Sequence, residues 1–280
     1  MEILAQGNTV TTVCRENDTV VSETVFLNRL WEARGMIRAD IRTYVIKDAG
    51  WEISENPAGL EPGERKIDFP SGTVGHIQGK KALGAFVRLP GGIMMKYLMN
   101  QCLNGLIQGE TYIIHERGYE TREEYNAFWN EIEKNGCRMY TYPDSSDLPW
   151  MEFVPKHSSD GKNLFNRFKS WDISCRGDEM TARGRFNDTY HELGLEIGYD
   201  RHSGTAGYCD VFYRRAPGAS CFGNSIHGQK LAGRNLYEIR KPELIEIFGR
   251  YSGCYHLTEI ARDTVNEIKS LHSGGEAAGE

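Results

Sequence analysis

The chain has 280 residues, of which 39% are apolar and 26% charged, enough for one large domain or two of ordinary size. This composition excludes a disordered chain, a collagen and a disulfide mini-protein. The formal net charge of -6 argues against a dedicated duplex-binding protein, which would present a basic face. Seven cysteines without framework spacing indicate reduced thiols.

The start of the chain and its apolar runs do not have the pattern of a secretion signal or a membrane span. Its first residues lack the basic and apolar regions of a secretion signal. No apolar run reaches the ~18 residues that a membrane span needs. We therefore expect a cytoplasmic protein with neither membrane nor nucleic acid among its partners.

Short blocks of the first half recur in the second half in the same order. Phe26–Leu30 resembles Leu164–Phe168, and Ile77–Gly84 resembles Ile226–Gly233 at a constant spacing. The shared order predicts a diverged tandem duplication. We expect a degenerate first copy over 8–137, a linker over 138–162, a second copy over 163–272 and a flexible tail over 273–280.

Within each copy, strand patterns precede helix patterns. In the first copy, Thr121 and Glu124 form a capping-box pattern that predicts a helix ending near residue 136. In the second, Met180–Phe186 and Leu193–Ile197 alternate as half-buried strands do, and residues 207–213 suggest a third strand. Apolar residues three or four apart over 244–248 and 257–268 predict two helices. The predicted class is α+β, as two tandem, diverged copies of a small antiparallel-sheet-plus-helices lobe.

Four residues of the second copy form a candidate metal site. Cys221 lies in a glycine-flanked loop, and Cys254 and His256 lie just before the last apolar helix. Thiolates with imidazole suit zinc or iron rather than magnesium or calcium. A helix N-terminus should also lower the pKa of the Cys254 thiol. His191 is the fourth candidate ligand.

Two carboxyl groups near these ligands are candidate catalytic residues. Glu259 follows His256 by three residues, so both should share a helix face, and Asp188 precedes His191 by three. In the repeat alignment, the first copy has Val45 at the position of His191. It has Asn104 at the position of His256 and keeps only Cys102, at the position of Cys254. One copy would then hold the site, while the other supplies packing or pocket walls.

A site-free interpretation of the same residues also stands. Free cysteine is among the most buried residue types, so Cys221 and Cys254 are equally understandable as small core residues. A single histidine on a strand, such as His191, is most often hydrogen-bonded for structural reasons.

The run Gly253–Ala261 and the Asn187–His191 stretch resemble a bacterial family known as domain of unknown function 2889, in which a Gly-Cys-x-His-Leu-Thr-Glu run recurs. Residues 210–268 also bear a distant similarity to NifU and IscU iron–sulfur scaffold domains, in which a cysteine opens the last helix. Those scaffolds carry a further cysteine on an early strand, where this chain has Thr189–His191. The departure favours a single metal ion over a cluster.

These observations lead to one functional hypothesis with two alternatives. We expect a zinc- or iron-dependent enzyme, a lyase or hydrolase, acting on a small carbonyl-containing or aromatic catabolic substrate, with the metal as Lewis acid or water activator. The chain would be a candidate for a homo-oligomer. The alternatives are an iron–sulfur or metal scaffold protein of the NifU and IscU type, and a metal-free structural or binding protein.

Overall fold

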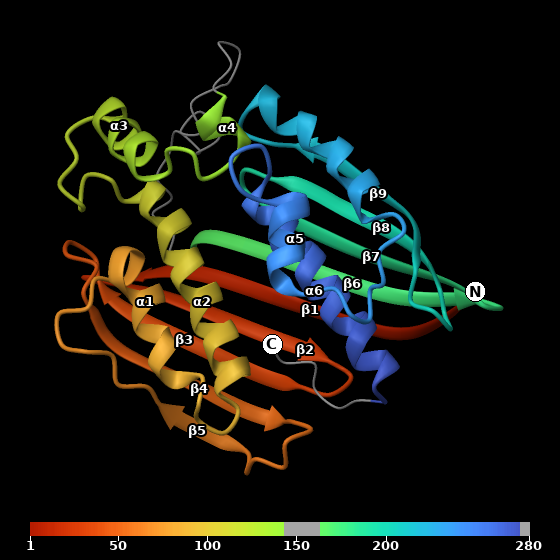
Figure 1. The fold of residues 1–280 in the computed structure, drawn as a ribbon. Helices are drawn as coiled ribbons and strands as arrows, with labels where there is room; N and C mark the ends of the chain where they lie inside the picture. The colour runs from red at the N-terminus through yellow and green to blue at the C-terminus, as the bar shows by residue number, and fades with distance from the viewer. Residues whose placement is uncertain (143–162, 275–280) are drawn as a thin grey trace.

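The computed structural model describes residues 1–142 and 163–274. Its strands form one antiparallel sheet in the order β5-β4-β3-β2-β1-β6-β7-β8-β9 (Figure 1). The strands are β1 (Glu2–Glu16), β2 (Thr19–Asn28), β3 (Glu32–Asp40), β4 (Ile46–Glu55), β5 (Gly63–Lys66), β6 (Asn163–Arg176), β7 (Glu179–Asp188), β8 (Glu192–Asp200) and β9 (Ala206–Arg215).

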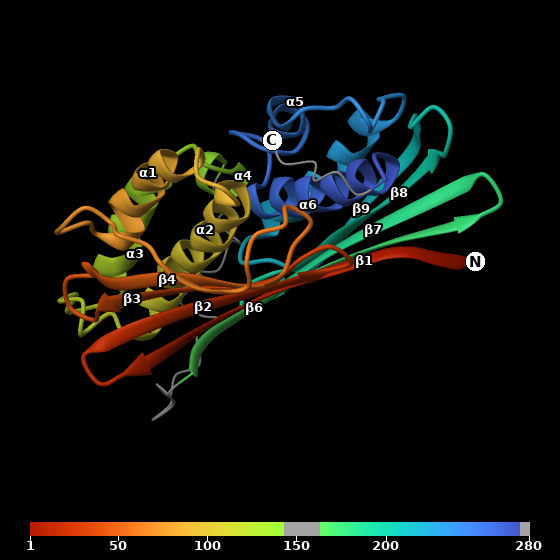
Figure 2. The ribbon, with the colours of Figure 1, turned by 90° about the horizontal axis from the view of Figure 1, so that it is seen from below.

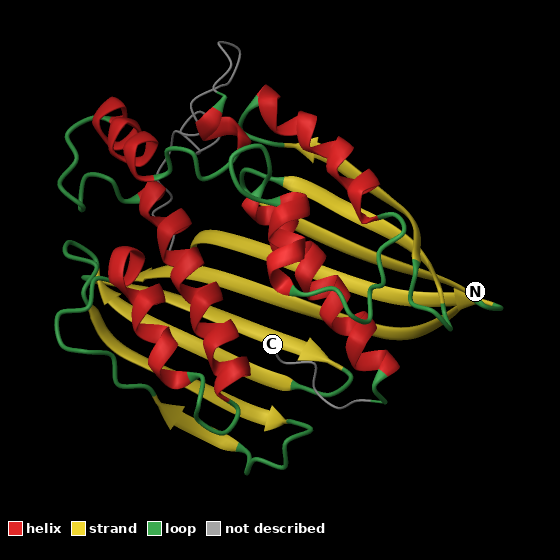
Figure 3. Ribbon diagram, viewed as in Figure 1, coloured by secondary structure: helices red, strands yellow, loops and turns green. Residues whose placement is uncertain are grey.

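The described helices gather on one face of this sheet, which Figure 2 shows nearly edge-on. They are α1 (Lys80–Ala82), α2 (Gly92–Gly109), α3 (Arg122–Ile132), α4 (Arg138–Thr141), α5 (Lys241–Phe248) and α6 (Tyr255–His272), with the 3-10 segment η5 (Ala219–Leu231) and the short turns η1 (Gly75–Gly79), η2 (Leu83–Phe86) and η3 (Glu110–Tyr112). The coloured view of Figure 3 separates the two layers clearly. Within the described ranges, no helix is long and apolar enough to cross a membrane.

Strand alternation explains which face the helices cover. Along β7, Met180, Ala182 and Phe186 are buried under the helices, whereas alternate residues are more exposed. α2 packs on β1, β2 and β3, and α6 packs on β6, β7 and β8. The core therefore lies between the sheet and these two long helices.

The hairpins of the two halves use the same turn chemistry at matching positions. The β1–β2 turn holds Asn17 at φ 53°, and the β6–β7 turn holds Gly177 at φ 63°. Residues with positive φ suit the tight turns that join antiparallel strands. After β3 and β8, Asp40 and Asp200 each accept hydrogen bonds from backbone N–H groups two and three residues ahead.

The two halves thus share one plan, with a register that differs from the one the sequence suggested. β2, β3 and β4 begin and end 160 residues before β7, β8 and β9. The pairing of Phe26–Leu30 with Leu164–Phe168 was wrong, because Leu164–Phe168 lies on β6, whose counterpart is β1. A common origin of the halves stays a prediction.

The two halves are joined at the centre of the sheet. β1 pairs with β6 along most of its length, so the strands make one continuous sheet rather than two separate ones. The predicted α+β class is confirmed. The expected helix after Thr121 also forms, since the Thr121 hydroxyl accepts a hydrogen bond from the Glu124 N–H at 3.1 Å.

The predicted domain limits stay predictions. α4 occupies the first residues of the expected linker, whereas residues 143–162 lie outside the described part of the chain, as do residues 275–280 of the expected tail.

Candidate functional site

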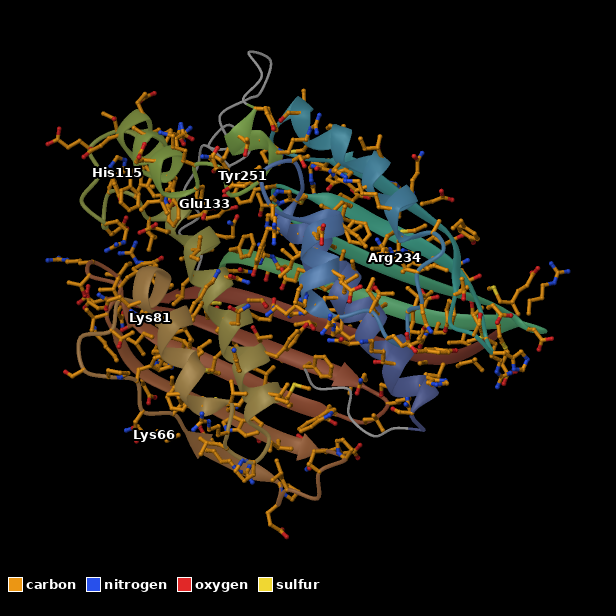
Figure 4. The ribbon with its side chains drawn as sticks, in the orientation of Figure 1. Lys66, Lys81, His115, Glu133, Arg234 and Tyr251 are labelled. Atoms are coloured by element: carbon orange, nitrogen blue, oxygen red, sulfur yellow. The ribbon has the colours of Figure 1, made fainter. Side chains whose placement is uncertain are left out.

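A pocket of about 330 Å³ opens where the two long helices meet the β7–β8 turn. We call it the junction pocket, because both halves of the chain line it. α2 contributes Asn104, Ile107 and Gln108, and the start of α6 contributes Cys254, Tyr255 and His256. Other lining residues include Lys80, Glu133, Cys137, Arg138, Arg167, Tyr190, His191, Cys221 and Asn224. Figure 4 labels Glu133 at this end of the molecule.

Asp188 organises the β7–β8 turn at the edge of the pocket. Its Oδ1 accepts hydrogen bonds from the backbone N–H groups of Tyr190 at 2.9 Å and His191 at 2.8 Å. This local arrangement follows from an Asp placed two and three residues before those amides. The same Oδ1 lies 3.0 Å from Nδ1 of the His191 ring.

That contact orients the His191 imidazole. With Nδ1 donating to a carboxylate, Nε2 is left with its lone pair, ready to bind a metal ion or accept a proton. The other carboxylate oxygen of Asp188 accepts hydrogen bonds from Nη2 and Nε of Arg167, at 3.0 and 3.2 Å. Burial alone would raise the pKa of Asp188, but His191 and Arg167 hold it well below its usual range. Asp188 is therefore ionised, and both of its carboxylate oxygens already accept hydrogen bonds.

His256 completes the cluster from the first turn of α6. Its ring centroid lies 4.0 Å from that of His191. Donor atoms of Asp188, His191 and His256 lie within 4.8 Å of one another. Desolvation, with His191 and Arg167 nearby, lowers the pKa of His256 well below 6.5, so the imidazole is neutral at pH 7. A neutral imidazole is the form that ligates metals.

Cys221 and Cys254 line the same pocket, but neither joins the group within 4.8 Å in the described part of the chain. Cys254 is the N-cap of α6 in an extended conformation, so it and His256 can both line the pocket although they are two residues apart. The lowered pKa expected for Cys254 was wrong. Backbone N–H groups of Leu257 and His256 act in that direction, but burial outweighs them and raises the pKa of the thiol.

Glu259 does not lie where the predicted catalytic role would require it. It is not among the lining residues of the junction pocket, and its Oε1 lies 2.9 Å from Nζ of Lys169 on β6. Gln101 of α2 donates to the same oxygen. Burial opposes ionisation of Glu259, but Lys169 prevails and holds its pKa well below its usual range.

One protein family matches the second half of the chain, where the candidate ligands lie. Residues 168–268 match the family described as "Protein of unknown function (DUF2889)". The resemblance seen in the Gly253–Ala261 run is supported over that range. No curated protein and no solved structure is significantly similar to the chain, so the distant likeness to NifU and IscU stays a prediction.

The DUF2889 match contains every residue predicted for the site. Arg138, Lys80 and the α2 residues of the pocket lie outside it, so the first half and the segment after α3 supply part of the wall. Arg138 is of particular interest, because its buried Nε finds no hydrogen-bond acceptor among the described residues. As a cation on the pocket wall, Arg138 favours an anionic group over a cationic one.

The structure also corrects which residues of the first half correspond to the site residues of the second half. The strand register puts Trp31, not Val45, at the position of His191, and Asn28 at that of Asp188. Cys102 lies in the middle of α2, whereas Cys254 precedes α6. The sequence analysis missed Arg167, Arg138 and Glu133 as pocket residues, and no local pattern of the sequence marks them.

Proposed function

We propose that this protein is an enzyme that holds zinc or iron in the junction pocket and acts on a small anionic, carbonyl-containing or aromatic molecule. The observation that carries the proposal is the convergence of Asp188, His191 and His256 within 4.8 Å in a pocket that Cys137, Cys221 and Cys254 also line.

The donor set suits such an ion. Nε2 of His191 and the neutral ring of His256 provide two nitrogen donors, and Cys221 and Cys254 are thiols on the wall of the same pocket. Asp188 acts as the carboxylate that fixes the His191 ring rather than as a ligand, because Arg167 and two backbone amides already occupy its oxygens. When bound, the ion would polarise a carbonyl or activate a water molecule.

The remaining lining residues support an anionic substrate. Lys80 and Arg138 face the pocket, and Glu133 is the carboxyl group beside them. Burial raises the pKa of Glu133 although Lys80 opposes the shift, so this carboxyl exchanges protons closer to neutral pH than an exposed glutamate does. We therefore assign to Glu133 the proton transfer first expected of Glu259, while Asp188 orients His191.

Metal content of untagged protein purified without oxygen tests the proposal. We expect about one zinc or iron per chain in the wild type, and its loss in His256→Ala and Cys254→Ala, both still folded by circular dichroism but with a lowered melting midpoint because the bound metal stabilises the folded chain. Cys175→Ala is the matched control, because Cys175 is a half-exposed cysteine of β6 outside the pocket. It should keep the metal.

Three other outcomes would overturn the proposal. Iron with an equal amount of acid-labile sulfide would indicate a cluster scaffold. Absence of bound metal from the wild type, even after incubation with zinc or ferrous ions, would indicate a metal-free binding protein. Metal retained by both pocket variants would place the ion elsewhere.

A further inference from the structure

A second pocket, of about 320 Å³, lies where the internal repeat places the counterpart of the junction pocket. Trp31 of the β2–β3 turn lines it, as His191 of the β7–β8 turn lines the junction pocket. Gly92 at the start of α2 lines it, as Tyr255 does at the start of α6. We call it the mirror pocket. Its volume is in the range of small-molecule sites, roughly 300–1,000 Å³.

The wall of the mirror pocket is mostly apolar and rich in aromatic rings. Phe26 packs edge-on against Tyr97, with ring centroids 5.5 Å apart, and lies 5.8 Å from Trp171. Leu89 and Ile93 are 54% and 48% exposed, so the pocket is open to solvent on their side. The other apolar lining residues are Leu30, Trp31, Ala58, Val87 and Met94. Such a wall suits an aromatic body.

Both charged side chains on this wall already have partners within the protein. Oε1 of Glu267 lies 3.7 Å from Nε of Arg29, and Oδ2 of Asp263 lies 2.7 Å from Nζ of Lys169. No described lysine or arginine lines the pocket. A charged ligand would therefore lose its hydration without meeting an open opposite charge, which is strongly unfavourable. The wall thus favours an uncharged molecule.

One polar group of the wall is within reach of such a molecule. Trp31 is 8% exposed, and its Nε1 donates no hydrogen bond to any described residue. This nitrogen is not sealed from solvent, unlike Oε1 of Glu267. Nε1 of Trp171, by contrast, already donates to Glu267 at 3.2 Å. Because an indole N–H can only donate, the partner that Trp31 can take is an acceptor, such as a carbonyl oxygen.

We propose that the mirror pocket binds a small uncharged molecule with an aromatic body and an oxygen acceptor. The body packs among Phe26, Tyr97 and Trp171, and the oxygen accepts a hydrogen bond from Nε1 of Trp31. This inference is independent of the function proposed for the junction pocket, because it rests on different side chains.

Ligand-detected NMR titration with 4-phenyl-2-butanone tests the proposal. 3-Phenylpropanoate and 2-phenylethylammonium carry the same ring with a negative and a positive charge. We expect saturable binding of the ketone and at least about tenfold weaker binding of both ions, because neither charge would find a partner to replace its hydration. No binding of the ketone, or binding of either ion as tight as that of the ketone, would overturn the proposal.

Trp31→Phe removes the donor and keeps an aromatic ring. It should weaken binding of the ketone about three- to tenfold, the range expected for one hydrogen bond between neutral groups. Butylbenzene has the same ring and no acceptor, so its binding should change by less than about twofold. Equal losses for the two probes would show that Nε1 of Trp31 makes no bond to the ligand.

A second variant keeps the test decisive if Trp31→Phe fails to fold. Leu89→Asp/Ile93→Asp changes two exposed residues of the wall and should weaken binding of the ketone at least about fivefold, because apolar contact is lost. Ile132→Asp is the matched control, since Ile132 is 54% exposed and lies outside the pocket. His256→Ala alters only the junction pocket and should leave binding unchanged. Binding that survives the double change but is lost in His256→Ala would place the ketone in the junction pocket and overturn the proposal.

Discussion

Nζ of Lys169 lies 2.7 Å from Oδ2 of Asp263, and both side chains are buried between β6 and α6. The same ammonium lies 2.9 Å from Glu259 and 3.0 Å from the hydroxyl of Tyr97 on α2. Burial opposes its charge, but the two carboxylates outweigh burial and raise the pKa of Lys169. One cation thus joins a central strand of the sheet to both long helices.

Replacing this cation should destabilise the fold strongly. Lys169→Met leaves Glu259 and Asp263 buried without their ammonium, and breaking a buried ion pair costs about 3–5 kcal/mol. Urea unfolding would measure the loss. Lys66→Met is the control, since the Lys66 side chain is 72% exposed and should change stability by less than about 0.5 kcal/mol. An effect of Lys169→Met no larger than that of the control would contradict the prediction.

The close packing of α6 on the sheet depends on a glycine of β7. A Cβ at Gly184 would lie 2.3 Å from Oγ1 of Thr264 and 2.9 Å from the side chain of Ile260. Gly184→Ala should therefore push α6 away and cost about 1–3 kcal/mol in the free energy of unfolding. Gly84→Ala is the matched control, because a Cβ there meets nothing within 4 Å. Thermal unfolding of the two variants compares them, and similar midpoints would refute the packing argument.

Acid should weaken the fold through two buried carboxylates. The pKa values of Asp188 and Glu259 are held below their ordinary values of 3.8 and 4.5. Groups with a lowered pKa in the folded state take up protons on unfolding, so their stabilisation is present above about pH 4.5 and is lost as the pH falls through and below this value.

The dependence of the unfolding free energy on pH between 5 and 3 measures this uptake. The double variant Asp188→Asn/Glu259→Gln should show a shallower slope than the wild type, by up to about two protons. A slope equal to that of the wild type would show that other carboxyl groups govern acid unfolding.

Much of the secondary structure could be predicted from local patterns. Alternation located the strands at Met180–Phe186 and Leu193–Ile197, and apolar spacing located α5 and α6. These patterns are visible because burial of one face has the period of the element itself. The correct alignment of the two halves could not be predicted from the sequence. The similar segments Phe26–Leu30 and Leu164–Phe168 lie on strands that are not counterparts in the sheet.

The candidate site was likewise predictable in its residues but not in their pairing. The sequence proposed His191, His256 and Asp188, and the structure brings their donor atoms within 4.8 Å. It could not show that Arg167 saturates Asp188, because that pairing depends on which strands are neighbours in the sheet.

By itself, the sequence determined the α+β class, the strand-then-helix order of each half and the residue types from which a metal site can be made. Only the tertiary structure decided that β1 and β6 merge the halves into one sheet, that Glu259 pairs with Lys169, and that residues of both halves line one pocket beside the long helices. The physical reason is that these interactions act over different separations along the chain. Periodicity and turn chemistry act between residues near in sequence, whereas strand pairing and charge pairing join residues far apart in the chain, and their energies depend on burial that only the folded chain creates.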